Sequence, residues 1–176
     1  MLVSTTDLQL DEVALVRAAQ AGDRAAFGSL YQIYSRMVYG ILLAHVKYCD
    51  AEDLLQDVFL KAMQQLSSLR EASSVGAWLA SIARRTGVDH HRRSRLTIVD
   101  DAKASTGSTP PESREALDCI LRLPEAYRET LILRLVEGMN GPEIAARTGM
   151  TPGSVRVNLC RGVKLLRDLM EGQKYE

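Results

Sequence analysis

The chain has 176 residues, its 22 basic side chains are balanced by 22 acidic ones, and 46% of its residues are hydrophobic. This is the composition of a folded globular protein and excludes a disordered chain. No apolar run approaches the roughly 18 residues of a membrane span, and the first residues lack the features of a signal peptide, so we expect a cytoplasmic protein. Aromatic residues make up 5%, whereas Leu, Ala, Arg and Glu are frequent, which favours helices over strands.

The charges are unevenly distributed along the chain. Residues 1–60 carry eight acidic and four basic side chains, and residues 61–100 carry three acidic and seven basic ones. Residues 144–167 carry five basic side chains and no acidic one. These two basic stretches are suited to a polyanion such as DNA, while the neutral chain as a whole is a poor non-specific DNA binder. Cys49, Cys119 and Cys160 are far apart and indicate reduced thiols rather than a disulfide framework or a zinc site.

One long segment lacks any hydrophobic periodicity. Residues 97–113 are rich in Ser, Thr, Asp, Gly and Pro and include Pro110-Pro111, which is typical of a flexible linker. The linker divides the chain into two small domains, residues 1–96 and 114–176. Because the linker contributes no core residues, we expect the two domains to be separable.

Four helices are predicted before the linker. The first covers about residues 11–21, and the second begins after the N-cap residue Asp23 and turns Phe27, Leu30 and Tyr31 inward. The third covers about residues 51–66, and the fourth starts at residue 73 or 74 and ends in a run of arginines. Trp78 has the spacing of a core residue, although it could also stack on a base.

The pattern of the second domain predicts a helix-turn-helix. A short helix around Leu117 stops at Pro124, a second covers residues 125–136, and a brief third, residues 143–148, is closed by Gly149. Thr151 caps a last long helix, whose inward positions we expect to be Val155, Leu159, Val163 and Leu166. Its outward Arg and Asn side chains suit the major groove, although an ordinary helical hairpin with a solvated basic face has the same pattern. No strand pattern is found, so the predicted fold is all-α.

Residue groups in both domains resemble one protein family. The groups in the second domain are Leu123-Pro124-Glu125, Arg128-Glu129, Glu137-Gly138, Glu143-Ile144-Ala145, Gly149-Met150-Thr151 and Gly153-Ser154-Val155-Arg156. Those in the first are Ala26-Phe27, Leu30-Tyr31, residues 51–59 (AEDLLQDVF), Ala77-Trp78-Leu79 and Arg92-Arg93. They resemble regions 4 and 2, respectively, of bacterial RNA polymerase sigma factors of the extracytoplasmic-function class. Arg85, Asn140-Gly141 and Val157-Asn158 depart from the family pattern.

The resemblance implies a role for each region. In region 2, one face of the third helix would bind the clamp of the largest catalytic subunit of core RNA polymerase, through Asp53, Gln56, Asp57 and Lys61. The end of the fourth helix would bind the −10 promoter element, through Arg84, Arg85, His90, Arg92, Arg93 and Arg95. The loop before that helix, residues 67–74, would capture a flipped base. A merely solvated acidic face and a solubilising helix end are the alternatives for these two surfaces.

In region 4, the last helix would read the −35 element, through Thr151, Ser154, Arg156, Asn158, Arg161 and Lys164. The implied partners are core polymerase, including the flap of its second large subunit, promoter DNA and an anti-sigma factor, in a stress or envelope response. We expect no enzymatic activity, cofactor, metal or small-molecule substrate, since no catalytic motif occurs. The alternatives are a sigma-like decoy that captures an anti-sigma factor and a dimeric helix-turn-helix regulator.

Overall fold

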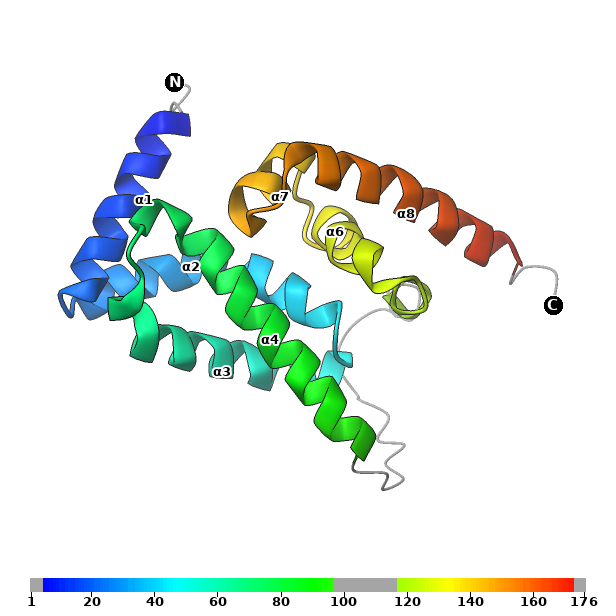
Figure 1. The fold of residues 1–176 in the computed structure, drawn as a ribbon, viewed down its shortest axis with the longest axis horizontal. Helices are drawn as coiled ribbons and strands as arrows, with labels where there is room; N and C mark the ends of the chain where they lie inside the picture. Colours follow the sequence, from blue (N-terminus) through cyan, green and yellow to red (C-terminus); the bar gives the residue numbers. More distant parts are fainter. Residues whose placement is uncertain (1–4, 97–116, 173–176) are drawn as a thin grey trace.

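The computed structural model describes residues 5–96 and 117–172, and every regular element within these ranges is helical (Figure 1). The first half contains α1 (Thr5–Gln20), α2 (Arg24–Leu43), α3 (Tyr48–Gln65), the short 3-10 turns η1 (Leu66–Ser68) and η2 (Ala72–Ser74), and α4 (Val75–Leu96). The second half has helical residues 117–121, then α6 (Glu125–Leu135), α7 (Gly141–Thr148) and α8 (Pro152–Gly172). The all-α prediction is confirmed. The linker lies outside the described residues.

Local capping sets several helix ends. The Asp23 carboxylate accepts from the backbone N–H groups of Ala25 at 2.8 Å and Ala26 at 3.2 Å, as an N-cap should. Asn140 and Glu143 form a reciprocal capping box, with bonds of 2.9 and 2.8 Å. This box starts α7 at Gly141, two residues before the predicted start. Gly149 ends α7 with a left-handed φ of 74°, a conformation that glycine adopts without a Cβ clash.

Two inward positions predicted from periodicity are wrong. Tyr31 is 39% exposed and lies beside Phe59, with the ring centroids 4.6 Å apart, because it sits at the edge of the stripe that α2 buries. Val163 is 38% exposed, and the neighbouring Gly162 takes the inward position instead. A Cβ on Gly162 would lie 3.0 Å from Leu131 Cδ1, so the missing side chain lets α8 approach α6 closely.

The two halves pack directly against each other, which differs from the separable domains expected from the linker. Helices α6 and α7 lie against α2 and α4, on the side away from α1 and α3 (Figure 1). The buried residues of both halves join into one hydrophobic core. A Cβ on Gly40 of α2 would lie 2.9 Å from Leu133 Cδ2 of α6, which shows how closely these helices approach. We call this packing the closed arrangement.

Candidate nucleic-acid and polymerase interfaces

The polar face of α3 is open to solvent. The Asp53, Gln56, Asp57 and Lys61 residues are all exposed, because the apolar stripe of α3 turns the opposite side inward, burying Leu54, Val58 and Ala62. Lys61 Nζ donates to Thr86 Oγ1 of α4 at 3.1 Å, so this side chain also joins the two helices. The two carboxylates and the amide remain available to a basic partner surface.

The same face carries two apolar side chains that the sequence analysis did not select. Leu60 is 53% exposed and lies one helical turn beyond Gln56 and Asp57, and Met63 is 52% exposed and lies about two turns beyond Gln56. Their signal in the sequence is that both fall off the apolar stripe of α3, although both are hydrophobic. An apolar centre with a polar rim is the usual anatomy of a protein–protein interface.

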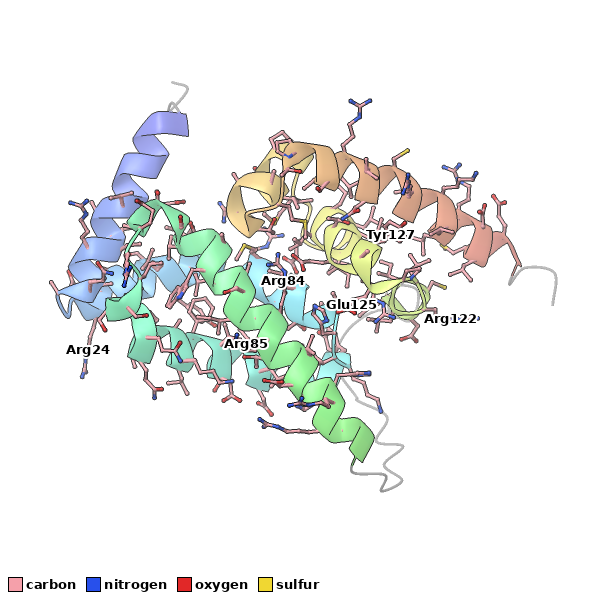
Figure 2. All side chains as sticks on the ribbon, in the orientation of Figure 1. Arg24, Arg84, Arg85, Arg122, Glu125 and Tyr127 are labelled. Carbon is pink, nitrogen blue, oxygen red and sulfur yellow. The ribbon has the colours of Figure 1, made fainter. Side chains whose placement is uncertain are left out.

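The basic residues of α4 are not equivalent in the structure. Arg85, Arg92 and Arg93 are exposed, and Arg92 Nη2 donates to Asp89 Oδ1 at 3.4 Å within the helix. The His90 imidazole lies 3.1 Å from Asp50 Oδ2 and joins α4 to α3. The side chain of Arg95 lies outside the described residues. Figure 2 shows Arg84 on the side of α4 that faces α6, with Arg85 on the other side.

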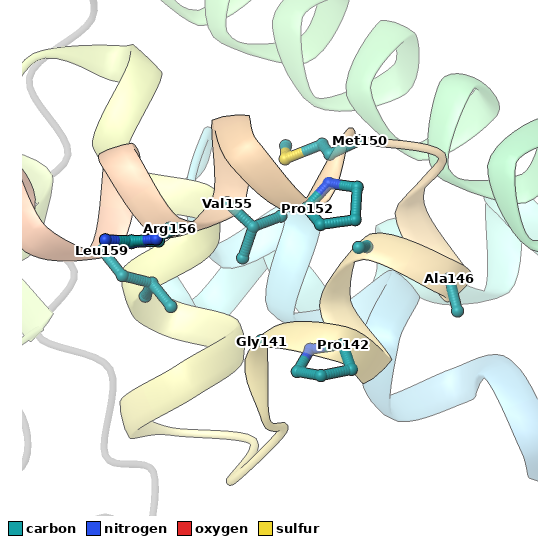
Figure 3. Close-up of a pocket in the computed structure, with 9 residues that line it drawn as sticks. Gly141, Pro142, Ala146, Met150, Pro152, Val155, Arg156 and Leu159 are labelled. Atoms are coloured by element: carbon teal, nitrogen blue, oxygen red, sulfur yellow. The ribbon is translucent and has the colours of Figure 1, made fainter.

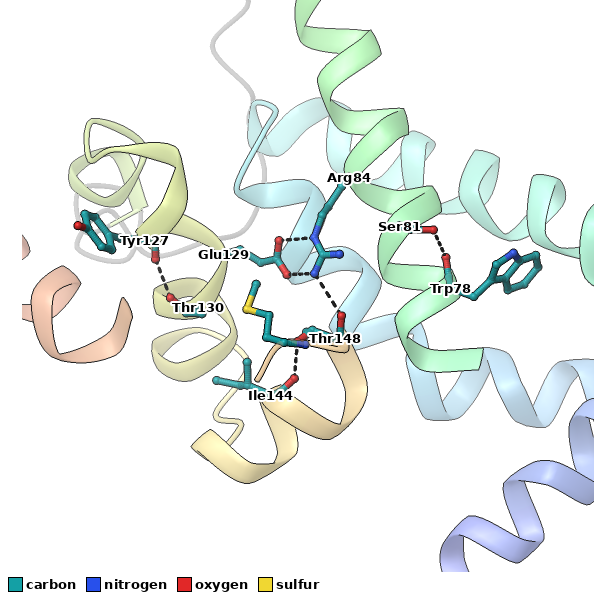
Figure 4. A network of polar contacts seen from close by, with 9 residues as sticks. Trp78, Ser81, Arg84, Tyr127, Glu129, Thr130, Ile144 and Thr148 are labelled. Atoms are coloured by element: carbon teal, nitrogen blue, oxygen red, sulfur yellow. Dashed lines mark hydrogen bonds and ion pairs between the residues drawn. The ribbon is translucent and has the colours of Figure 1, made fainter. Parts of the chain in front are cut away.

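Arg84 is bound to the second half of the protein. Its Nε donates to Glu129 Oε2 at 2.8 Å and its Nη2 donates to Glu129 Oε1 at 2.7 Å, a bidentate ion pair (Figure 4). Nη2 also lies 3.4 Å from the Thr148 carbonyl, at the end of α7. The Glu129 side chain is only 8% exposed, and its hydrogen bonds raise the pKa of Arg84 above the ordinary value. Arg84, which is expected to bind DNA, is therefore bound to α6 in this structure.

Arg147 of α7 makes a second link between the halves. Its Nη1 donates to the Ile33 carbonyl at 2.6 Å, and its guanidinium carbon lies 5.6 Å from the centre of the Tyr34 ring. The Tyr34 hydroxyl donates to Glu12 Oε2 at 2.8 Å, so the contacts continue from α7 through α2 to α1. Burial and the Glu12 carboxylate both raise the pKa of Tyr34. Sequence patterns carry no signal for this long-range link.

The helix-turn-helix presents its recognition residues outward. Arg156, Arg161 and Lys164 are exposed on α8, and Asn158 is half-buried. Thr151 Oγ1 accepts from the Ser154 backbone N–H at 3.1 Å, which confirms Thr151 as the N-cap. Its hydroxyl also lies 2.8 Å from Ser154 Oγ, so these two side chains already serve the cap. The closed arrangement leaves the basic side of α8 uncovered.

An apolar groove runs beside the start of α8. Its volume is about 650 Å³, and it lies between α7 and α8 (Figure 3). Pro142 and Ala146 line its α7 side, and Val155, Arg156 and Leu159 line its α8 side. Arg156 therefore stands at the border between an apolar surface and the basic side of the recognition helix. Within residues 5–96 and 117–172, no cluster of three or more His, Cys, Asp or Glu side chains is placed to hold a metal ion.

Comparisons with known proteins show which family this chain belongs to. Residues 30–97 match the model of Sigma-70 region 2, and residues 113–166 match that of Sigma-70 region 4. The chain is 31% identical to the RNA polymerase sigma factor CarQ of Myxococcus xanthus over 85% of this chain and 91% of that one. It is 32% identical to the ECF RNA polymerase sigma-E factor of Escherichia coli K12, over 87% and 91%. It is 32% identical to the ECF sigma factor BldN of Streptomyces coelicolor and spans 64% of that longer protein.

Two solved structures share the fold. CnrH in complex with the cytosolic domain of CnrY has a TM-score of 0.67, with 23% identity over 92% of this chain and 98% of that one. The sigma factor RpoE of Bartonella quintana, in complex with the anti-sigma factor NepR, has a TM-score of 0.58, with 22% identity over 82% and 96%. With both region models matched in order and relatives above 30% identity along nearly their whole length, this chain belongs to the sigma-70 family of RNA polymerase sigma factors, in its extracytoplasmic-function class.

Proposed function

We propose that this sigma factor binds core RNA polymerase through the α3 face and brings promoter DNA to α4 and α8. Asp53, Gln56 and Asp57 supply hydrogen-bond acceptors and one amide around the exposed Leu60. The basic side of α8 takes the duplex of the −35 element. The arginines of α4 take the −10 element as its strands separate, since guanidinium groups both contact phosphates and stack on unpaired bases.

The observation that carries this proposal is the exposure of the polar α3 face and the basic α8 side on one folded chain. A protein that only captured another protein would have no use for Arg156 and Arg161 at a capped helix start that suits the major groove. The Arg84–Glu129 pair adds one requirement. Because the Arg84 guanidinium donates two hydrogen bonds to Glu129, the closed arrangement has to open before Arg84 can contact DNA.

The proposal extends to the setting of this activity. As a specificity subunit the protein itself would catalyse no reaction and would act in the cytoplasm, in a stress or envelope response. No described helix is long and apolar enough to cross a membrane. An anti-sigma factor belongs to the proposal because RpoE of Bartonella quintana, which shares the fold, was solved with one. Such a partner would act by preventing contact with polymerase or DNA.

The decisive experiment is in vitro transcription of sheared genomic DNA by core polymerase with this protein, followed by sequencing of RNA 5′ ends. We expect new start sites that share two upstream sequence elements. Replacing Asp53, Gln56 and Asp57 together with Ala should weaken core binding by about tenfold or more, the loss expected for an interface hot spot. Gln32→Ala, on the exposed side of α2, is the matched control and should bind as the unaltered protein does.

The roles of the two DNA-binding surfaces, on α8 and on α4, can be tested separately in the same transcription assay. Arg156→Ala should cost about 1–3 kcal/mol in closed-complex formation if Arg156 pairs with a base edge. Replacing Arg92 and Arg93 with Ala should spare closed complexes and reduce permanganate reactivity of unpaired thymines. Core binding without any start site would favour the decoy. Tight duplex binding by the free protein, as a dimer, would favour the plain regulator.

A further inference from the structure

The loop between α3 and α4, residues 67–74, is held from outside by the last residue of α1. Gln20 Nε2 donates to the Leu66 carbonyl at 2.9 Å and to the Leu69 carbonyl at 2.8 Å, across 46 and 49 residues of sequence. These carbonyls belong to the first residue of η1 and to the residue that follows its end, where the helical hydrogen bonds of α3 run out. A glutamine amide has two N–H donors, and both of them bind the loop backbone here.

Gln20 is itself fixed in place. The turn after it uses Gly22 at a φ of 97°, and the backbone N–H of Asp23 returns to the Ala18 carbonyl at 3.0 Å. One helical turn earlier, Val16 is fully buried against the core. The end of α1 is therefore a rigid support, and it packs beside both η1 and η2 (Figure 1).

The loop presents its polar side chains outward on this support. Leu66 and Ala72 are buried and anchor its two ends, whereas Ser67, Arg70 and Ser73 are exposed. Glu71 Oε1 accepts from Ser73 Oγ at 2.8 Å and turns the second half of the loop. Gln20 reaches the loop backbone from α1, and α1 lies outside the residues matched by the region 2 model, 30–97.

We propose that Gln20 is a positioning residue that holds the α3–α4 loop in the shape that captures an unpaired base of the −10 strand. This inference rests on the proposed function, in which the arginines of α4 receive that strand as it separates, and it adds the base capture that the family resemblance implies for the loop before α4. Gln20 contacts no DNA in this proposal. It sets the path of the backbone through Leu66 and Leu69, and without it the exposed serines lose their fixed positions.

The test uses holoenzyme made from core polymerase and the full chain. A single-stranded non-template oligonucleotide is first selected from a random pool by the unaltered holoenzyme. An abasic site is then placed at each position in turn, and the position with the largest loss of affinity is kept. The measured quantity is the affinity for the intact oligonucleotide divided by the affinity for its abasic version. Inactive protein and weakened phosphate contacts lower both affinities and leave this ratio unchanged.

Gln20→Glu keeps the shape of the side chain but removes both donors, and Gln20→Leu is a second variant without the added charge. We expect an intact-to-abasic ratio on the order of tenfold or more for the unaltered holoenzyme, in the range of one base stacked on protein. The ratio should fall to about threefold or less in both variants, with equal affinities for the abasic oligonucleotide. Gln32→Glu, the same change on the exposed side of α2, should keep the full ratio.

The failures of the two proposals are distinguishable. A full ratio in both Gln20 variants overturns the role of Gln20 and leaves the proposed function in place. A flat profile, in which the unaltered holoenzyme loses no affinity at any abasic position, overturns base capture itself and the role of Gln20 with it. A reduced ratio in Gln32→Glu as well would also overturn the role of Gln20, because the effect would then follow any added charge.

Discussion

The guanidinium of Arg84 can serve only one of two partners at a time. In the closed arrangement it donates two hydrogen bonds to Glu129, whose side chain is 8% exposed. The Glu129 carboxylate offers two anionic oxygens to the guanidinium, as a DNA phosphate would. The charge that is expected to hold DNA thus also stabilises the arrangement in which DNA cannot reach it.

Replacing Glu129 with Gln should weaken the closed arrangement by about 1–3 kcal/mol, because a half-buried guanidinium loses a charged acceptor. The measurement is energy transfer between dyes on the exposed Cys49 and Cys160, one in each half, with the buried Cys119 left unlabelled. Transfer efficiency should fall. Glu137→Gln is the control, since its partner Arg36 is 73% exposed and such pairs contribute about 1 kcal/mol or less. Equal losses in both variants would contradict the prediction.

His45 makes the closed arrangement sensitive to acid. Its side chain is 9% exposed, its Nε2 has no hydrogen-bond partner, and its Nδ1 lies 3.4 Å from Glu125 Oε1. Burial lowers the pKa of His45 and outweighs the opposite effect of Glu125 and Glu129. The unfolded chain protonates His45 at a higher pH than the folded protein does. The folded state therefore keeps its full stability above about pH 6.5 and loses stability as the pH falls below that value.

We therefore expect the free energy of unfolding to decrease as the pH falls from 7.5 to 5.5, by at most about 1.4 kcal/mol per pH unit from this group. Urea unfolding at a series of pH values measures the slope. His45→Asn should flatten the slope, whereas His91→Gln, at an exposed position of α4, should not change it. An identical slope in His45→Asn would assign the pH dependence to other groups.

At the scale of elements, α4 and α7 meet at a glycine. A Cβ on Gly76 would lie 2.6 Å from the backbone oxygen of Arg147 and 3.0 Å from Tyr34 Cε1. A backbone oxygen cannot move aside as the end of a flexible side chain can. The contact between these two helices therefore depends on the absence of one methyl group, although Gly76 lies in a helix where alanine is intrinsically preferred.

Gly76→Ala should consequently favour helix α4 and disfavour its docking to α7. We expect lower energy transfer between Cys49 and Cys160, with helicity by circular dichroism unchanged or slightly higher. Gly28→Ala is the matched control, because its Cβ meets nothing within 4 Å and the change should stabilise α2 by about 1 kcal/mol or less. Unchanged energy transfer in Gly76→Ala would show that the helices adjust to the added methyl.

On the scale of the whole molecule, the two halves are joined by packing as well as by the covalent chain. Apolar contacts between α2 and α6 and the polar links of Arg84 and Arg147 act together. If a protease site is inserted within residues 97–113, the cleaved halves should still co-elute in gel filtration. Combining Gly76→Ala with Glu129→Gln should let them separate. Separation of the otherwise unaltered halves after cleavage would contradict the closed arrangement.

Much of this protein follows from its sequence alone. The spacing of apolar residues predicts the helices, and Asp23 and Thr151 cap helices as expected, because both signals are local. The exposure of Asp53 and Arg156 follows from the same periodicity. Periodicity is less reliable at the edges of a stripe, which is why it places Tyr31 and Val163 inward although both are exposed.

The pairing of residues far apart in the chain was decided only by the tertiary structure. Arg84 and Glu129 are 45 positions apart, and Gln20 is 46 positions from Leu66, so no local pattern connects them. A charged residue near a helix end has the same appearance in a sequence whether it meets DNA, solvent or another helix. The packing of α6 and α7 against α2 and α4 makes that choice, because it brings one carboxylate, buried from solvent, within hydrogen-bond distance of Arg84.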